Sequence, residues 1–283
     1  GIIGNCKSAA LVKKNSSIEW LCLPQFDSPS VFGKILDENI GGSFEIIPDK
    51  LYNINQKYIE NTNILITYFK NKESAESNLT NIQKIGRDGL IGSVDLLDLK
   101  AVEKFSNQAK DKFGKIHSVI FATGPFLHIM PVLEAKPEDV YYTLDADIKG
   151  FYHVLKAVVP ILKEGGGGSI TALTTAAIHR YISTDGLSSI PKSGVQHLCT
   201  AIAREEGHHG IRANCVAVGL IAVGLSQEID SPPGGILDQW MNQVPLGRAG
   251  APEELFDTVV FLASKNAGYI SGQSLPVDGG YSA

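Results

Sequence analysis

The chain has 283 residues, 43% hydrophobic and 19% charged, a composition typical of one or two globular domains with a large core. The net charge of −5 argues against nucleic-acid binding, and no apolar run is long enough to span a bilayer, so we expect neither a nucleic-acid partner nor a membrane partner. The four cysteines have neither metal nor disulfide-framework spacing, which predicts a reducing cytoplasm and no metal site.

Residues 1 to about 62 have an all-β pattern. Ala9–Val12 and Ile18–Leu23 predict two strands around a polar turn, and Ser43–Pro48 predicts another. The segment is therefore expected to form a small β-rich unit of its own.

From residue 63 onward, strand patterns alternate with helix patterns, which predicts an α/β fold with a parallel sheet. The expected elements are strands over 63–68, Leu90–Val94 and Ser118–Phe121, and helices from Glu73 to about Gly86, over Leu99–Phe113 and over the long region 140–162. The segment from Gly219 to about Gln243 should form a variable lid over any substrate.

The stretch from Gly168 to Gly219 carries the densest set of side chains suited to chemistry. The strand Ser169–Leu173 leads into two hydroxyls, Thr174 and Thr175. A second buried strand, over 211–216, leads into Gly219 at the edge of the sheet where α/β proteins bind ligands.

A helix is expected between these two strands. Pro191 occupies the place of a first helical residue, and Gly207 should end the helix. Lys192 is therefore expected in the first turn. Its apolar stripe would consist of Val195, Leu198, Cys199 and Ile202.

This stretch and four C-terminal motifs resemble the short-chain dehydrogenase/reductase family over about residues 64–283. The motifs are Pro245–Arg248, Phe261–Ser264, Ile270–Gln273 and Val277–Gly280. The resemblance implies a Rossmann-like parallel sheet with helices on both faces. It also implies an NAD(P)-dependent oxidoreductase for a small carbonyl or alcohol substrate, assembled as a homodimer or homotetramer.

The family's catalytic residues can be placed by their offsets. Its lysine follows a tyrosine by four residues, and its serine precedes that tyrosine by thirteen. Counting from Lys192, the tyrosine position holds Ser188 and the serine position holds Thr175, while the family's asparagine falls at Asp147. Tyr181 is the only local phenol; it is either a substitute or a loop-packing aromatic, and Lys192 could equally be a solvated lysine.

Loss of the tyrosine changes the chemistry that the site can perform. A phenol has an ordinary pKa of about 10, and a nearby ammonium can lower that pKa enough for proton exchange with the substrate oxygen. An aliphatic hydroxyl such as that of Ser188 does not do this easily. It could orient a carbonyl, but the proton would have to come from another group.

The resemblance also places cofactor contacts. Lys70 and Lys72 lie where related enzymes bind the adenosine ribose. Two cations there would suit the 2′-phosphate of NADP, but an exposed loop with lysines explains them equally well, so NADP and NAD both stay open. The cofactor-binding residues implied are Asp95, Leu96, Gly124, Lys192, Gly219, Ile221 and Lys70.

The family's first strand, first helix and glycine-rich phosphate turn have no counterpart here. Gly165–Gly168 runs from a helix into a strand, which is the wrong polarity for presenting a helix N-terminus to a pyrophosphate. Cofactor binding is therefore expected to be weak. The missing strand is central in the family's sheet, and Ile18–Leu23 is the most strand-like candidate to replace it.

The N-terminal motifs Gly1–Asn5, Ser17–Pro24 and Phe26–Phe32 resemble the N-terminal β-sandwich of glucoamylase/trehalase-like glycoside hydrolases. That family's catalytic carboxylates lie in a helical barrel, and no part of this chain resembles the barrel. The chain is thus expected to join a β-rich segment, residues 1–62, to a reductase-like domain, residues 63–283, with the first βα unit replaced.

Two functions remain open from the sequence. One is an NAD(P)-dependent oxidoreductase impaired in cofactor binding and catalysis. The other is a non-catalytic reductase-like fold, or fusion product, with a packing or partner-binding role.

Overall fold

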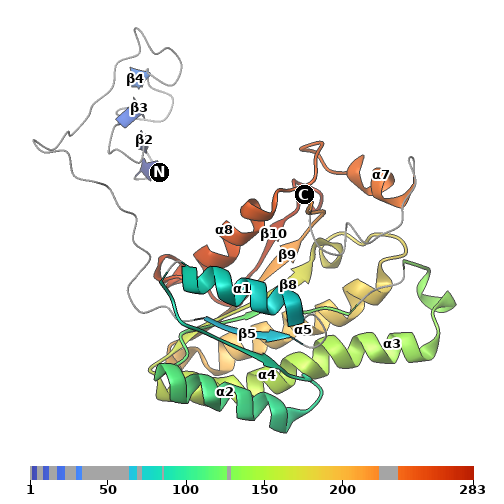
Figure 1. Ribbon diagram of the computed structural model, residues 1–283. Coiled ribbons are helices and arrows are strands. Elements are labelled where there is room, and N and C mark those ends of the chain that lie inside the picture. The colour runs from blue at the N-terminus through green and yellow to red at the C-terminus, as the bar shows by residue number, and fades with distance from the viewer. Residues whose placement is uncertain are drawn as a thin grey trace, which may run out of the picture. The chain divides into compact units, whose positions relative to one another are not determined.

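The computed structural model describes residues 2–4, 9–12, 18–22, 30–33, 64–68, 72–84, 86–125, 129–222 and 235–283 (Figure 1). It contains two compact units, Gly1–Glu60 and Asn61–Ala283. No helix in these segments is long and apolar enough to cross a membrane.

The first unit contains an antiparallel sheet in the order β1-β2-β3-β4. The two strands predicted around the polar turn are confirmed as β2 and β3, with Leu11 opposite Trp20. β1 and β4 were not predicted, and Ser43–Pro48 lies outside the described residues. The strands are β1 (Ile2–Gly4), β2 (Ala9–Val12), β3 (Ile18–Cys22) and β4 (Ser30–Gly33).

The second unit contains two parallel sheets. One has four strands in the order β10-β9-β8-β7, and the other pairs β5 with β6. The strands are β5 (Ile64–Tyr68), β6 (Gly89–Ser93), β7 (Ser118–Phe121), β8 (Gly168–Thr175), β9 (Ile211–Val218) and β10 (Ser274–Val277).

Within the described part of the chain each of the two sheets has two edge strands, β5 and β6 in one and β7 and β10 in the other. β5 pairs there with β6 alone, and β7 with β8 alone. The expectation that Ile18–Leu23 fills the missing central position is wrong, because β3 pairs with β2 and β4. Those partners are close in sequence, so pairing with them closes short loops at a small entropic cost.

The helices follow the strands in the alternation that the sequence predicts. They are α1 (Lys72–Lys84), α2 (Leu99–Phe113), α3 (Pro137–Leu144), α4 (Gly150–Glu164), α5 (Gly186–Glu205), α7 (Ile236–Met241) and α8 (Pro252–Ala263), with short 3-10 turns at Val132–Glu134, Ala176–Ile178, Gly207–His209 and Lys265–Ala267. The long helical region expected over 140–162 is confirmed, and within it a π-helical turn, Asp145–Lys149, joins α3 to α4.

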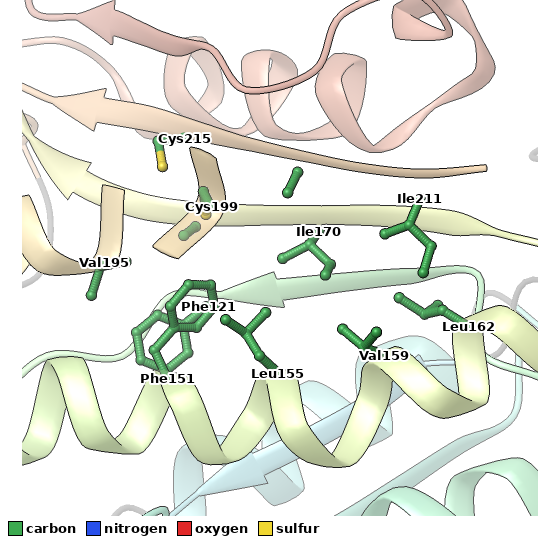
Figure 2. Packing of buried hydrophobic residues seen from close by; sticks show 12 residues of the cluster. Phe121, Phe151, Leu155, Val159, Leu162, Ile170, Val195, Cys199, Ile211 and Cys215 are labelled. Atoms are coloured by element: carbon green, nitrogen blue, oxygen red, sulfur yellow. The ribbon is translucent and has the colours of Figure 1, made fainter. Parts of the chain in front are cut away.

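Helices cover both faces of the four-stranded sheet, which confirms the Rossmann-like α/β fold (Figure 1). Successive side chains of β9 point to opposite faces of the sheet. Cys215 belongs to the core under α4 and α5, and Val216 belongs to the core under α8. In the first of these cores the rings of Phe121 and Phe151 have centroids 4.6 Å apart (Figure 2). The predicted apolar stripe of α5 packs into this core.

A third apolar cluster packs the β5–β6 sheet against helices of the same unit. Phe105 of α2 and Val158 of α4 are buried together in it, and Leu90 of β6 and Val119 of β7 pack against them. A side chain at Gly92 would lie 2.3 Å from the Phe105 ring, so glycine is required where α2 crosses β6. The two sheets are thus joined through helices rather than through strand pairing.

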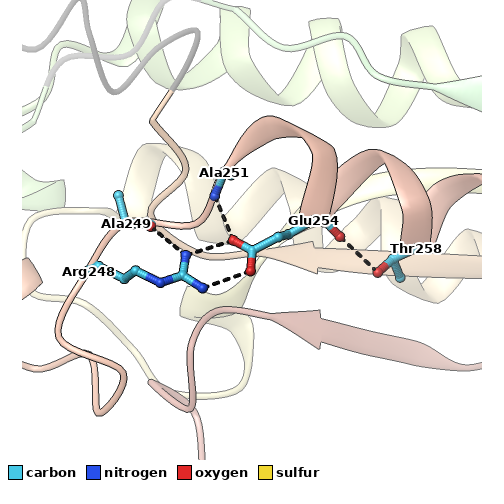
Figure 3. A network of polar contacts seen from close by, with 5 residues as sticks. All are labelled: Arg248, Ala249, Ala251, Glu254 and Thr258. Atoms are coloured by element: carbon cyan, nitrogen blue, oxygen red, sulfur yellow. Dashed lines mark hydrogen bonds and ion pairs between the residues drawn. The ribbon is translucent and has the colours of Figure 1, made fainter. Parts of the chain in front are cut away.

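The start of α8 is fixed by a polar network (Figure 3). Arg248 binds both carboxylate oxygens of Glu254, at 2.7 and 2.8 Å, and the Ala251 amide donates to the same carboxylate at 2.8 Å. The hydrogen bond from Arg248 is the main reason why the pKa of Glu254 is lowered to about 2. This network orients the helix that covers the second face.

Candidate functional site

α5 starts earlier than the sequence predicts, and this moves the site residues. The helix begins at Gly186, so Ser188 lies in its first turn, Lys192 in its second, and Pro191 inside it. The first turn is closed by the Asp185 carbonyl, which accepts the amides of Ser188 and Ser189 at 3.2 and 3.0 Å, so no proline is needed to start the helix. Pro191 has no amide N–H, so the helix lacks one main-chain hydrogen bond at this position, and the proline ring is buried.

Because Ser188 and Lys192 are four residues apart in α5, both lie on one face of the helix. The helix packs against β8 and the turn that follows it. The residues at the tyrosine and lysine positions of the predicted site therefore lie on neighbouring turns next to the C-terminal end of β8.

Lys192 is the centre of a buried ion pair. Its Nζ lies 2.8 Å from Asp147 Oδ1 and donates to the Thr123 carbonyl oxygen at 2.7 Å. The two side chains are 12% and 1% exposed, respectively. The alternative that Lys192 is a solvated lysine is therefore wrong. A side chain at Gly124 would lie 3.7 Å from the ammonium, so three of the predicted site residues do come together.

Asp147 owes its inward position to the π-helical turn between α3 and α4. π-turns insert an extra residue into a helix and are often found at functional sites. Burial raises the pKa of Asp147, and the charge and hydrogen bond of Lys192 only partly oppose this rise. The pair is thus buried, with Asp147 almost wholly removed from solvent.

Thr175 lies at the end of β8, opposite Val218 of β9. Its hydroxyl accepts the Ala177 amide at 3.2 Å and so starts the short 3-10 turn after the strand. Since the oxygen is the acceptor in that bond, the O–H can donate to a ligand at the sheet edge.

Tyr181 lies in the loop before α5 and is 58% exposed. A side chain at Gly186 would lie 3.3 Å from its hydroxyl, so the phenol sits beside the start of the helix. The hydrogen-bond partners of Lys192 are Asp147 and Thr123, and the described residues show no hydrogen bond between Lys192 and Tyr181.

The residues expected at the adenine end have mainly local roles here. Asp95 is exposed and accepts the Leu97 amide at 2.9 Å. The side chain of Leu96 packs against Gly150, and its carbonyl oxygen lies 2.8 Å from His153 Nδ1. Lys70 lies outside the described residues.

The residues expected at the nicotinamide end follow β9. The amide of Gly219 donates to the Val277 carbonyl at 3.0 Å, and a side chain at Gly219 would lie 2.5 Å from the Asp278 backbone. Ile221 is buried in the core under α8 and bridges to Gly250. Gly219 is thus needed for close backbone packing, and Ile221 for the core.

The described residues contain no phosphate cradle of the glycine-rich kind. None of the strands in this part of the chain is followed immediately by clustered glycines and a helix N-terminus. Gly165–Gly168 connects α4 to β8, and Gly167 packs so closely on Gly210 that a side chain would lie 2.6 Å from its carbonyl oxygen. The residues present suit the nicotinamide half of a dinucleotide better than its pyrophosphate.

Sequence reasoning missed Asp185, the residue before α5. It is 9% exposed, and burial raises its pKa to about 7, while a hydrogen-bonding interaction with Ser188 lowers the pKa. An aspartate just before a helix is a usual N-cap signal, but such a cap normally accepts backbone amides, which stabilise the carboxylate. Here the side chain makes no such bond, a fact that only the structure shows.

The sequence matches a family described as enoyl-(acyl carrier protein) reductase over residues 58–282. It is 31% identical over 221 residues to the NADP-dependent mannitol dehydrogenase of Hypocrea jecorina, covering 77% of this chain and 81% of that protein. It is also 28% identical over 227 residues to the 3alpha-hydroxysteroid dehydrogenase of Mediterraneibacter gnavus, covering 79% of this chain and 89% of that protein.

The fold is similar to that of solved structures as well. A short-chain type dehydrogenase/reductase from Mycobacterium ulcerans superposes with a TM-score of 0.73 at 24% identity, over 78% of this chain and 80% of that chain. The relatives named above act on different substrates according to their names, so they indicate a shared chemistry rather than one substrate.

Proposed function

Because the chain belongs to the short-chain dehydrogenase/reductase family, we propose that it is an NAD(P)-dependent oxidoreductase with weak cofactor binding and slow turnover. Its substrate would be a small carbonyl or alcohol. The observation that carries the proposal is the buried ammonium of Lys192, held by Asp147 and the Thr123 carbonyl on the same helix face as Ser188.

This arrangement leaves Lys192 able to bind a ligand. An ammonium has three N–H donors, and the two bonds to Asp147 and Thr123 leave one donor for a ribose or substrate oxygen. Thr175 would donate its O–H to the substrate oxygen. A bound nicotinamide would supply hydride transfer, and these residues would orient the group that accepts or loses the hydride.

Two losses support the weakened activity. The described residues present no glycine-rich turn at a helix N-terminus, so among them the charge of a pyrophosphate would have no preformed amide partners. With Ser188 in place of a phenol, the site lacks its ordinary proton donor, and general acid–base catalysis typically contributes ~10²–10⁴-fold to the rate.

The name of the Hypocrea jecorina relative specifies NADP, whereas the sequence of this chain leaves NADP and NAD open. NADPH and NADH should therefore both be tested as ligands. We also propose a homodimer or homotetramer in the cytoplasm, and a glycoside-hydrolase-like β segment at residues 1–62. These parts of the proposal rest on the family and on the sequence motifs.

The test is a fluorescence titration of NADH and NADPH into the whole chain and into a repaired variant. In that variant a reductase first strand and glycine turn replace residues 1–62, and Ser188→Tyr is added. We expect weak binding by the natural chain, and tighter binding with faster reduction of a carbonyl by the repaired variant. Tight binding and ordinary turnover by the natural chain would contradict the proposed weakness.

A non-catalytic role is the second candidate, and the open edges of β5 and β7 favour it. Open edges can pair with a strand from a partner. A repaired variant that binds cofactor, beside a natural chain that neither binds it nor turns over, would support this candidate.

A further inference from the structure

We infer that Lys192 itself gives the proton to the substrate oxygen in this chain, and that Asp147 is the positioning residue that aims it. The inference rests on the proposed oxidoreductase function and deepens it. It names a proton donor for a site whose tyrosine position holds Ser188.

The ammonium of Lys192 is held in a fixed orientation by its two acceptors. Its Nζ donates to Asp147 Oδ1 at 2.8 Å and to the Thr123 carbonyl at 2.7 Å. The bond to Cε and these two hydrogen bonds occupy three of the four tetrahedral directions around the nitrogen, so the direction of the third N–H is determined. The ring centroid of Phe121 lies 5.6 Å from Nζ, which adds a cation–π contact to this restraint.

The ammonium lies at the edge of the sheet where the site residues gather. Phe121 of β7 is opposite Ala172 of β8. Gly124 and Thr175 each follow that pair by three residues, so both lie at the C-terminal ends of neighbouring strands. Apart from its chain neighbours, Lys192 Nζ is the only described atom within 4 Å of the place where a Gly124 side chain would begin. A ligand atom beside Gly124 would therefore meet the ammonium.

An ammonium group can do the work of a phenol in general acid catalysis. The ordinary pKa of an alkyl ammonium is about 10.4 and that of a phenol is about 10, so the two groups are acids of similar strength. An aliphatic hydroxyl such as that of Ser188 is a far weaker acid. Ser188 can therefore orient the carbonyl, while the proton comes from the lysine one turn later in α5.

The transfer balances without a further reactant. In the reducing direction the carbonyl carbon takes its electron pair from the hydride of the nicotinamide, one N–H bond of Lys192 breaks, and an O–H bond forms on the substrate. The neutral amine keeps its hydrogen bonds to Asp147 and Thr123. It regains a proton from water, because the Lys192 side chain is 12% exposed, whereas that of Asp147 is 1% exposed. Oxidation of an alcohol runs the same transfers backwards.

The first measurement needs no cofactor. The whole chain is labelled with ¹⁵N-lysine, and the ammonium signal that Lys192→Arg lacks in NMR spectra identifies Lys192. We expect alcohols and ketones to shift this signal, because their oxygen accepts the third N–H, and to leave the signals of exposed lysines in place. A Lys192 signal that none of these compounds shifts would overturn the inference.

The second measurement is turnover of the whole chain with NADPH or NADH and a panel of aldehydes and ketones. Lys192→Arg keeps a cation for Asp147, but a guanidinium does not release its proton in proteins. We expect kcat to fall by about 10²-fold or more, with little change in KM for cofactor or carbonyl. Lys104→Arg, at an exposed position on α2, is the matched control and should keep the natural rate.

Chemical rescue separates a proton donor from a cation that only binds. The variant Lys192→Ala, Asp147→Asn removes both charges, so no buried ion is left unpaired, and circular dichroism checks that it folds. Ethylammonium should restore part of the turnover, the more acidic 2-fluoroethylammonium should restore more at equal occupancy, and methylguanidinium should restore none. Rescue by methylguanidinium, or by neither ammonium ion, would overturn the inference.

The positioning role of Asp147 is tested through the acceptor that it offers. Asp147→Asn keeps an oxygen that can accept the ammonium, whereas Asp147→Leu has a similar size and no acceptor. Misplacement of a catalytic group can cost about 10²-fold, so kcat should fall by about that factor in Asp147→Leu and far less in Asp147→Asn, with KM little changed. Equal kcat values for the folded fractions of these two variants would contradict the positioning role.

The outcomes separate this inference from the proposed function. Turnover by the natural chain that survives Lys192→Arg unchanged would overturn the role of Lys192 and leave the oxidoreductase function standing. A natural chain that reduces none of the carbonyls would overturn the proposed function and the inference together.

Discussion

At the residue scale, the Asp147–Lys192 pair is the most consequential buried interaction, because each charge depends on the other. Removing one partner of a buried pair leaves an uncompensated charge, which typically costs about 3–5 kcal/mol. We therefore expect Lys192→Met to destabilise the protein by about that much in urea unfolding at pH 7. The double variant Lys192→Met, Asp147→Asn should recover much of the loss, whereas equal destabilisation by single and double variants would contradict the coupling.

Asp185 should make stability fall as pH rises. Its folded pKa of about 7 lies above its ordinary value of 3.8, so the folded state holds a proton that the unfolded state releases across that interval. The cost of burying the charge is absent below about pH 4 and complete above about pH 7. Asp185→Asn should therefore stabilise the protein increasingly from pH 4 to pH 8, on the order of a few kcal/mol by urea unfolding.

Asp111→Asn, at an exposed position on α2, is the matched control, and it should leave the pH dependence of stability unchanged. If Asp185→Asn instead shifted stability by the same amount at every pH, the carboxyl would have an ordinary pKa in the folded protein.

At the element scale, the sequence predicted most helices and strands, and its failures have local causes. Leu99–Phe113 and Ser118–Phe121 match α2 and β7 residue for residue. Pro191 was misplaced because a proline usually starts a helix, and here main-chain capping by Asp185 starts it earlier. The break at Asp145–Lys149 has no proline or glycine to signal it; it was missed because pairing with Lys192, a contact distant in sequence, accompanies it.

The positions of the site residues could be predicted from the sequence, but their surroundings could not. Offsets within a family motif located Thr175, Ser188, Lys192 and Asp147, and the structure brings Lys192 and Asp147 together. Burial is set by the fold, so the burial of Asp185 and its raised pKa could not be obtained from spacing.

The start of α8 gives a matched test of helix capping. Glu254→Gln removes the carboxylate that binds Arg248 and the Ala251 amide, whereas Glu253→Gln, one residue earlier, removes a carboxylate in the same turn. We expect a lower Tm for Glu254→Gln than for Glu253→Gln at pH 7. The depressed pKa means that the carboxylate stabilises the fold above about pH 4.5, and that this contribution is lost as the pH falls through about 2.

The difference between the two variants should therefore shrink in acid. Equal Tm values at neutral pH would show that the network in Figure 3 does not stabilise α8.

The open edge of β7 should be visible in hydrogen exchange. Its amides that face β8 are bonded, while those that face the unpaired side have no strand partner within the described residues. Ile120 on this strand is 48% exposed. We expect peptides over β7 to exchange much faster than peptides over β8, which pairs on both sides. Equal protection of the two strands would mean that another segment covers the edge.

At the scale of the whole molecule, the two compact units predict that the reductase-like part folds without the first. A chain of residues 61–283 should give a circular dichroism spectrum with substantial helix and should unfold cooperatively, because the apolar clusters formed by the described residues lie within it. Limited proteolysis of the full chain should leave a stable fragment of similar length. A fragment without helix, or without a cooperative transition, would show that folding depends on residues 1–60.

Because β5 and β7 have unpaired edges, the balance between folding and aggregation should depend on the concentration of the chain. Closure of the second unit through α2 and α4 is a first-order process, whereas edge-to-edge pairing between copies is at least second-order. Dilution slows only the second process. The yield of folded monomeric units should therefore fall steeply with the rate of synthesis, and slow expression would favour native packing over aggregation.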